Sequence, residues 1–195
     1  MEHFNVKFIK IDVVFAKIDS GDGLEILKLA KENGVKTSID LVSENSNRYS
    51  LVIPCLNFVD NLIINEVEAG AIVGIEPNEN NLIEIAKKLK DLGVSERVII
   101  HTPSVSVCAS NDGETVMPSY DLPSDFIVGT TGAGDAFCAG ALIGIYQEKT
   151  DKEILEFASS TAVLALTKAD AVSGLLTEKE IIEFCKPLKR KEIKG

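Results

Sequence analysis

Short apolar runs alternate along the chain with stretches in which apolar residues recur at helical spacing. The β-rich run at residues 9–18 is broken at residues 21–23, and residues 24–30 then show helical spacing. Gly34 fits the position just past the end of that helix, and residues 35–40 form a second short strand. Strands that alternate with helices in this way favour an α/β fold with a mainly parallel sheet.

The same alternation continues along the rest of the chain. Residues 43–50 are predicted to be a loop, residues 54–60 to lead into a strand, and residues 117–126 to be irregular. A hairpin turn is predicted at residues 111–113. Further strands are predicted around residues 62–64, 97–101 and 104–108, and further helices around residues 82–89, 136–146 and 150–166 and after Thr177. The last two helices follow a Thr with a Glu three residues later, which is the spacing of a capping box.

Short polar residues stand where several of these strands should end, at Asp19, Asp40, Asn65 and residues 101–102. Ligands of open α/β sheets bind at the carboxyl ends of the strands. Taken singly, each of these residues is better explained as a helix cap or a turn former than as a ligand. Together they mark one edge of the sheet as the candidate site.

Composition agrees with a globular protein of one domain. The chain has 195 residues, of which 45% are hydrophobic and 26% charged, and these proportions are ordinary for such a protein. We expect one domain over residues 1–187, long enough to bury a full core. Residues 188–195 form a basic tail that we expect to be solvated or frayed, as chain ends commonly are.

Charge, apolar patterning and cysteine spacing argue against several classes of function. The net charge is −10. Phosphate neutralisation needs clustered Lys and Arg, so we expect no binding of nucleic acid. No apolar window is long enough to span a membrane. A zinc site is not expected, because the chain has two histidines and its four cysteines are widely spaced, at Cys55, Cys108, Cys138 and Cys185. Buried thiols in a reducing cytosol are the preferred interpretation, so we expect a cytoplasmic protein.

The strongest chemical signal is the sequence Thr-Thr-Gly-Ala-Gly-Asp at residues 130–135, directly before an apolar helix. Small residues let the backbone approach a ligand closely. The first N–H groups of a helix lack partners within the helix, and with the positive helix end they form an anion site. Asp135 would repel an anion, but it makes sense as the base for a nucleophile that attacks a phosphoryl group.

Spacing alone leaves a second interpretation of this segment open. Asp135 could simply cap the helix, and Gly132 and Gly134 could simply form a tight turn. The segment is not a Walker A loop, because no Lys follows, and it lacks the third glycine of a dinucleotide fingerprint, where Phe137 stands.

The run from Thr130 to Asp135, continued by residues 136–140, resembles the C-terminal signature of the ribokinase-like (PfkB) carbohydrate kinases. Residues 65–68, Asn-Glu-Val-Glu, resemble the N-x-x-E motif of that family, and the two motifs occur in the family's order. The resemblance extends from about residue 13 to residue 187. It implies a Rossmann-like, three-layer αβα fold with a mainly parallel sheet.

The resemblance also implies an activity, namely phosphorylation of a sugar or nucleoside hydroxyl by ATP with Mg²⁺. Asp135 would be the general base. Thr131 and the backbone amides of Gly132, Ala133 and Gly134 would form the anion hole and bind ATP. Asn65 and Glu68 would help to place the magnesium ion and the phosphates, often through water. The alternative for Glu68 is an ordinary exposed carboxylate.

Two positions depart from the family's pattern. Gly129 stands where the family usually has an Asp, which weakens any monovalent-cation site. The turn after residue 101 lacks both glycines of the family's Thr-x-Gly-x-x-Gly sequence, so the resemblance assigns no nucleotide contact there. We interpret His101 as a strand-end histidine whose hydrogen bonds are satisfied, rather than as a catalytic group.

The largest departure lies at the front of the chain. Nothing before Ile9 could supply the Gly-Gly sugar-binding motif or the small lid sheet of the family. We therefore expect a truncated carbohydrate kinase with incomplete sugar recognition, which would form a homo-oligomer or need a complementary N-terminal chain. The alternative is a catalytically poor remnant that binds nucleotide or a partner chain.

Overall fold

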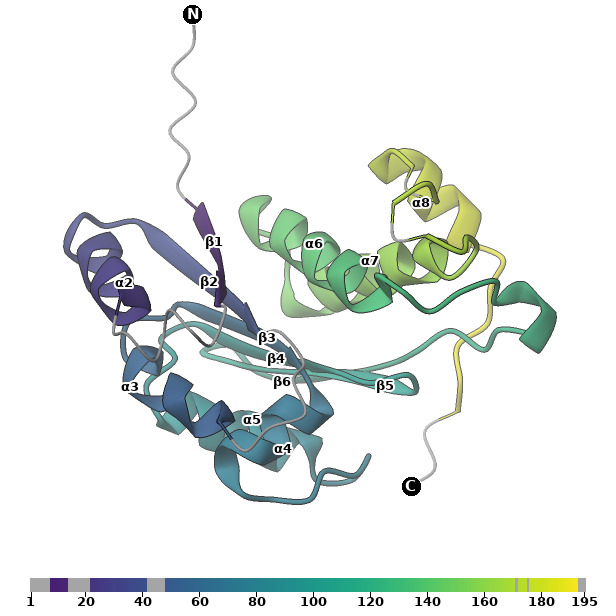
Figure 1. The fold of residues 1–195 in the computed structure, drawn as a ribbon. Coiled ribbons are helices and arrows are strands. Elements are labelled where there is room, and N and C mark those ends of the chain that lie inside the picture. The colour runs from purple at the N-terminus through teal and green to yellow at the C-terminus, as the bar shows by residue number, and fades with distance from the viewer. Residues whose placement is uncertain (1–7, 14–21, 42–47, 171, 175, 193–195) are drawn as a thin grey trace, which may run out of the picture. The chain divides into compact units, whose positions relative to one another are not determined.

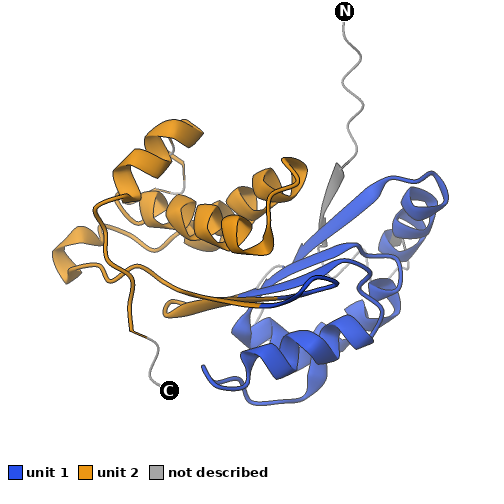
Figure 2. Cartoon of the chain, turned by 180° about the vertical axis from the view of Figure 1, so that it is seen from behind, with its two compact units in different colours: residues 1–100, 109–114 blue, residues 101–108, 115–195 orange. Residues whose placement is uncertain are grey.

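The structure is a computed structural model, and it describes residues 8–13, 22–41, 48–170, 172–174 and 176–192. Contacts divide the chain into two compact units (Figure 2). Unit 1 contains residues 1–100 and 109–114, and unit 2 contains residues 101–108 and 115–195. The predicted residues 14–18, Asp19 and residues 43–47 lie outside the described part.

Unit 1 is built from strands that alternate with helices (Figure 1). In chain order its elements are β1 (Phe8–Val13), α2 (Asp22–Glu32), β2 (Lys36–Leu41), η1 (Tyr49–Val52), α3 (Ile53–Leu56), β3 (Asn61–Asn65), α4 (Glu66–Val73), α5 (Leu82–Asp91) and β4 (Arg97–His101), whose last residue belongs to unit 2. β1 pairs with β2 in parallel, and β2 pairs with β3 in parallel. Parallel neighbours need a crossover connection, which α2 supplies between β1 and β2.

Six strands form one sheet in the order β1-β2-β3-β4-β5-β6. β5 (Val105–Ser110) and β6 (Gly113–Pro118) are joined by the two residues Asn111 and Asp112, so the predicted hairpin is confirmed. β1 stands first in the order and has a strand neighbour on one side only. The predicted α/β class is confirmed by this alternation of strands and helices.

The core of unit 1 explains why β3 and β4 are uninterrupted apolar runs. The apolar side chains of these two strands are all 0% exposed: Leu62, Ile63, Ile64, Val98, Ile99 and Ile100. Strands covered on both faces read as continuous hydrophobic runs rather than as alternating patterns. Leu82, Ile85 and Leu89 on α5 are also buried, at the helical spacing that predicted this element.

Unit 2 contains η2 (Ser124–Phe126), α6 (Ala133–Tyr146), α7 (Asp151–Ala165) and α8 (Glu178–Cys185). α6 and α7 approach each other closely at Gly140. A Cβ atom added there would lie 2.6 Å from Thr161 Oγ1 and 2.8 Å from Ala158 Cα. Only a residue without a side chain fits this position while the two backbones keep their separation.

Three helices begin with a reciprocal capping box. It joins Asn65 to Glu68 at α4, and it confirms the predicted boxes that start at Thr150 on α7 and at Thr177 on α8. In each box the side chain of the first residue accepts a hydrogen bond from a backbone N–H inside the helix. The carboxylate of the Glu accepts one from the backbone N–H of the first residue. α6 begins differently, at Gly132, with no side-chain cap.

The prediction of a solvated C-terminal tail is wrong for residues 188–192. Arg190 forms an antiparallel bridge with Tyr120, and its guanidinium lies 4.1 Å from the centre of the Tyr120 ring. The backbone N–H of Lys191 donates to Ser119 O at 2.9 Å. Leu188 packs against the buried cluster that contains Tyr120 and Cys185. The basic residues are therefore part of the packing of unit 2.

Several element boundaries also differ from the predictions. Tyr49 and Ser50 lie in the 3-10 helix η1 rather than in a loop. Pro54 lies in the first turn of α3, where its fixed φ is suited to a helix start, and not in a lead-in to a strand. Met117 lies in β6, which extends further than predicted because its hairpin partner β5 runs on to Ser110.

A Gly140→Ala substitution tests the close approach of α6 and α7. The added methyl group must displace backbone atoms of α7, so we expect the free energy of unfolding to fall by about 1–3 kcal/mol. Gly134→Ala is the matched control, because its Cβ would lie no closer than 3.5 Å to another residue. We expect that control to be neutral or slightly stabilising. Urea titration of both variants measures the difference, and equal unfolding midpoints would show that the packing is not tight.

Candidate functional site

The start of α6 leaves backbone amides without hydrogen-bond partners. Gly132 has a left-handed conformation, with φ 79° and ψ 1°, which reverses the chain before the helix. Ala133 N donates to Thr130 O at 3.3 Å. Among the residues that the structure describes, none accepts a hydrogen bond from the amides of Gly132, Gly134 or Asp135. Unbonded donors at the positive end of a helix can bind an anion, so the anion hole stays a prediction that this geometry permits.

Asp135 is exposed and lies in the first turn of α6. It does not cap the helix, since no side-chain cap bond is made there, and in the described part of the chain nothing donates a hydrogen bond to its carboxylate. The interpretation of Asp135 as a simple helix cap is therefore wrong. The tight-turn interpretation is correct for Gly132, whose positive φ needs glycine.

His101 lies against this first turn. Its ring packs on Phe137 of α6, with ring centres 4.7 Å apart and planes inclined by 33°. A Cβ added at Gly134 would lie 3.5 Å from His101 Cε1, the carbon between the two ring nitrogens. The nitrogen-bearing edge of the imidazole therefore faces the start of the helix.

Burial lowers the pKa of His101 to about 4, so its imidazole is neutral at pH 7. Within the described residues its ring nitrogens make no hydrogen bond, and neither nitrogen is among the buried atoms that lack a partner. His101 ends β4, as predicted, and no described residue bonds its ring nitrogens. A neutral imidazole keeps one N–H donor, which is available to a ligand beside α6.

Asn65 and Glu68 lie together in unit 1, where β3 ends and α4 begins. Asn65 Oδ1 accepts a hydrogen bond from Glu68 N at 2.9 Å, and Glu68 Oε2 accepts one from Asn65 N at 3.2 Å. Glu68 is 1% exposed, so its interpretation as an ordinary exposed carboxylate is wrong. The N-x-x-E sequence has a structural role as a capping box.

The donor set of Asn65 and Glu68 fits a magnesium ion in chemical type, because Mg²⁺ prefers oxygen ligands and keeps several waters. Both side chains are held in place by their reciprocal bonds. Over the described ranges no group of three or more His, Cys, Asp and Glu residues gathers in one place. These two residues would therefore hold the ion together with water and substrate oxygens rather than enclose it.

Gly129 is closed to a side chain. A Cβ at this position would lie 2.9 Å from Lys168 O and 3.1 Å from Ala169 Cα, which are backbone atoms. The Asp that the resembled family carries there would need the segment around Lys168 to move. The departure at Gly129 therefore changes the local packing as well as the charge.

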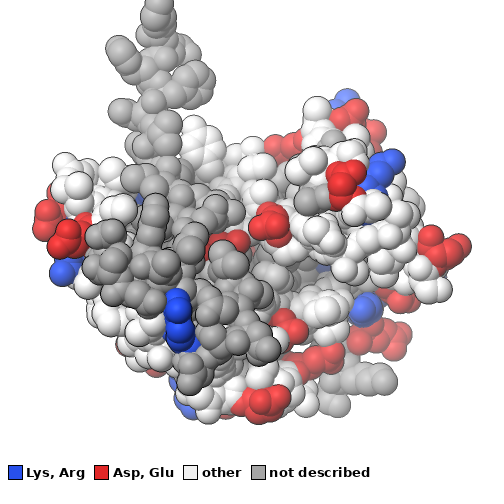
Figure 3. Space-filling model, in the orientation of Figure 1, with Lys and Arg blue, Asp and Glu red and all other residues white. Residues whose placement is uncertain are grey.

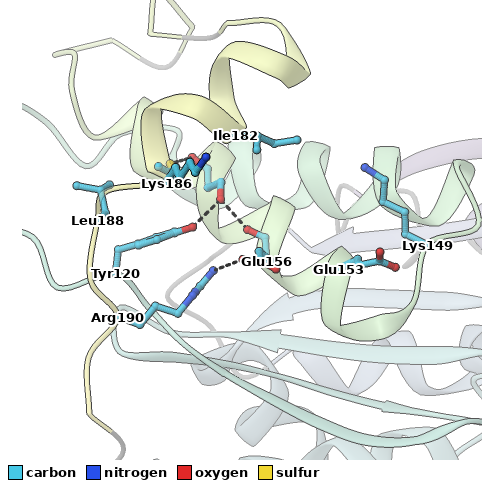
Figure 4. A pocket seen from close by; sticks show the side chains of 10 residues that line it. Tyr120, Lys149, Glu153, Glu156, Ile182, Lys186, Leu188 and Arg190 are labelled. Carbon is cyan, nitrogen blue, oxygen red and sulfur yellow. Dashed lines mark hydrogen bonds and ion pairs between the residues drawn. The ribbon is translucent and has the colours of Figure 1, made fainter.

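A cavity of about 550 Å³ lies elsewhere in unit 2 (Figure 4). Its lining includes Tyr120, Ser160 and Arg190, and none of its lining residues belongs to the start of α6. The sequence analysis missed this region, because it treated Arg190 as part of a free tail. Leu188, an apolar residue among charged ones, was the available signal that the tail is packed.

Among the charged side chains on the face shown in Figure 3, acidic ones are more numerous than basic ones, in agreement with the net charge of −10. All four cysteines are buried, as predicted. None of the described helices is both long and apolar enough to cross a bilayer.

A glycine turn that leaves helix amides unbonded beside an exposed carboxylate, within an α/β fold, is typical of proteins that bind phosphate groups at helix starts. A profile of the pfkB family of carbohydrate kinases matches residues 2–178. The chain belongs to this family, so the resemblance drawn from residues 65–68 and 130–140 is confirmed.

The similar proteins include sugar kinases. The chain is 29% identical over 165 residues to ribokinase from Haemophilus influenzae, a match that covers 83% of this chain and 51% of that protein. Among solved structures, it superposes with a TM-score of 0.69 on Arabidopsis thaliana ribokinase complexed with ribose and ATP, at 24% identity, over 84% of this chain and 52% of that one. A putative ribokinase II from E. coli gives a TM-score of 0.75 at 19% identity, over 94% and 60%. The ribokinase-like fold is confirmed, and the chain spans about half the length of the curated relatives it matches.

The lowered pKa of His101 predicts a specific pH dependence of stability. The unfolded chain binds a proton at an ordinary histidine pKa near 6.5, whereas the folded chain binds it only near pH 4. The free energy of unfolding of the wild type relative to His101→Phe should therefore be constant above about pH 7. It should decrease as the pH is lowered from about 6.5 to about 4. Urea unfolding at a series of pH values measures it. A difference that does not change with pH would mean that His101 titrates normally.

Proposed function

We propose that this chain carries the phosphoryl-transfer site of an ATP-dependent phosphotransferase that acts on a sugar or nucleoside hydroxyl. One observation carries the proposal. The exposed carboxylate of Asp135 has no hydrogen-bond partner among the described residues, and it stands in the same turn as the unbonded amides of Gly134 and Asp135. A base and an anion site in one helix turn are what attack by a hydroxyl on a phosphoryl group requires.

In this proposal Asp135 accepts the proton of the attacking hydroxyl as the new O–P bond forms, the bond from the γ-phosphorus to the β–γ bridging oxygen of ATP breaks, and ADP leaves. The amides of Gly132 and Gly134 donate hydrogen bonds to the oxygens of the transferred group, where negative charge is held in the transition state. Ala133 N contributes less, because it already donates to Thr130 O. Thr131, which is exposed directly before Gly132, lies where it can contact the nucleotide.

His101 adds a donor that the sequence analysis did not assign. Its neutral imidazole faces Gly134 and can donate one N–H to a phosphate oxygen. A neutral donor suits this position, since a charged imidazolium beside a helix N-terminus is disfavoured by the positive end of the dipole. Its packing on Phe137 fixes the plane of the ring.

Mg²⁺, when bound, neutralises the charge of the ATP phosphates. Asn65 and Glu68 would help to hold it through water, because their side chains are already locked in the capping box. Burial of Glu68 keeps its carboxylate in one orientation, which is suited to ordering water molecules rather than to following the metal.

The substrate class rests on the relatives. These relatives are named ribokinase, fructokinase and, among the solved structures, adenosine kinase. A small sugar or nucleoside alcohol is therefore the proposed acceptor. Because the chain spans about half of these relatives, we propose that a second copy or a complementary N-terminal chain completes acceptor binding. A remnant that binds nucleotide without turnover is the second candidate.

An Asp135→Asn variant tests the proposed base. We expect ATP turnover, measured as ADP release with ribose, fructose or adenosine, to fall by roughly 10²–10⁴ because the hydroxyl proton has no acceptor. Nucleotide affinity, measured by calorimetry, should change little, since the amides are retained. Asp125→Asn is the matched control, as Asp125 is an exposed acid of the same unit.

Three outcomes separate the candidates. Wild-type turnover that survives in Asp135→Asn refutes the role of Asp135. Binding of ATP by the wild type without turnover supports the remnant. Absence of both binding and turnover refutes the proposed function.

Self-association is expected for the chain alone. β1 has a strand neighbour on one side only, and an open strand edge invites pairing with another chain. Light scattering at several concentrations should show a mass that increases with concentration, and sugar-dependent turnover should be low. A stable monomer that phosphorylates a sugar at an ordinary kinase rate would contradict this expectation. The net charge of −10 favours solubility but does not pair the edge.

A further inference from the structure

The cavity between α7, α8 and the C-terminal segment has a rigid polar wall. Tyr120 OH and Ser160 Oγ are 2.9 Å apart, and Ser160 Oγ donates to Glu156 O at 2.8 Å, so the Tyr120 hydroxyl is the donor to Ser160. Arg190 Nη1 donates to Pro118 O at 2.6 Å while its guanidinium covers the Tyr120 ring. Cys185 Sγ lies 3.7 Å from Ser160 O. All of these residues belong to unit 2, and Figure 4 shows Tyr120, Glu156 and Arg190 side by side.

Two basic side chains of the lining, Lys186 and Arg190, have no hydrogen-bonded acidic partner among the described residues. Arg190 Nη2 is buried and makes no hydrogen bond, and its distance of 3.9 Å to Glu156 Oε1 is too long for one. In the described part of the chain Lys186 makes no ion pair. The carboxylate of Glu153 accepts hydrogen bonds from the backbone N–H and the hydroxyl of Thr150. Three basic residues, Lys149, Lys186 and Arg190, and two acidic residues, Glu153 and Glu156, line the cavity, so its lining has an excess of one positive charge in a protein whose net charge is −10.

Apolar side chains complete the lining. Ile182 is 51% exposed although it is large and hydrophobic, and Leu188 is half-buried. Both line the cavity, which has a volume of about 550 Å³. Ligand pockets for small molecules measure about 300–1,000 Å³ and combine an apolar wall with a few placed polar groups.

We propose that this cavity is an accessory binding site for a small organic anion, a carboxylate or phosphate monoester on an apolar body. Lys186 and Arg190 would bind the anionic group by charge-assisted hydrogen bonds. The apolar body would lie against Ile182 and Leu188. The site is separate from the start of α6, so it does not depend on the proposed phosphotransferase activity.

The three tyrosines of the chain provide a specific probe. In protein labelled with ¹³C at tyrosine, phenyl phosphate should shift the Tyr120 signal saturably, because Tyr120 lines the cavity. Tyr49, in unit 1, and Tyr146, at the end of α6, do not line it, and their signals should stay unchanged. Benzoate replaces the phosphate by a carboxylate and identifies which anion the site prefers. Inorganic phosphate and benzyl alcohol each lack one half of the ligand and should bind more weakly.

Lys186→Glu should weaken binding of the preferred anion at least tenfold. Lys152→Glu is the matched control, since it makes the same charge change at an exposed position on α7 that does not line the cavity. Its affinity should equal that of the wild type. The proposal is overturned if the Tyr120 signal does not saturate, if both variants lose affinity equally, or if benzyl alcohol binds as tightly as the anions.

Discussion

The unbonded amides at the first turn of α6 are the constraint on which the candidate site depends. A helix end without partners is costly unless water, a side chain or a ligand satisfies it. Three other helices satisfy their ends with capping boxes, at Asn65, Thr150 and Thr177. α6 instead begins at a glycine with positive φ, and the helix is held in place further along, where Gly140 meets α7 and Phe137 meets His101. The stability of this segment therefore comes from its apolar face and not from its start, which remains open to an anion.

Much of the fold was predictable because its signals are local. The Thr and Glu pairs at the starts of α7 and α8 interact within one turn, so their spacing alone identified both helices. The hairpin at Asn111 and Asp112 and the apolar runs of β3 and β4 are local in the same sense. The glycine turn at Gly132 was predictable for the same reason. Its resemblance to a family signature then supplied the chemistry.

The properties that were not predictable depend on residues that are distant in the sequence. Burial of Glu68 and of the His101 ring is decided by packing, and nothing adjacent to either residue in the chain indicates it. The lowered pKa of His101 has the same origin. Arg190 was misinterpreted because a cluster of charges at a chain end resembles a solvated tail. Only contact with Tyr120, which lies far away in the sequence, gives it a structural role.

The bridge between Tyr120 and Arg190 affects the order in which the parts of the chain can fold during synthesis. The hydrogen bond from Arg190 to Pro118 O joins residues 72 positions apart. A polypeptide leaves the ribosome with its N-terminal side first, and contacts of long sequence separation form late. Segments up to β4 can assemble while synthesis continues. Unit 2 must wait, because the edge beside Ser119 and Tyr120 stays uncovered until Arg190 and Lys191 have emerged. Closure of the unit that carries the candidate base thus waits until residues 190 and 191 are available.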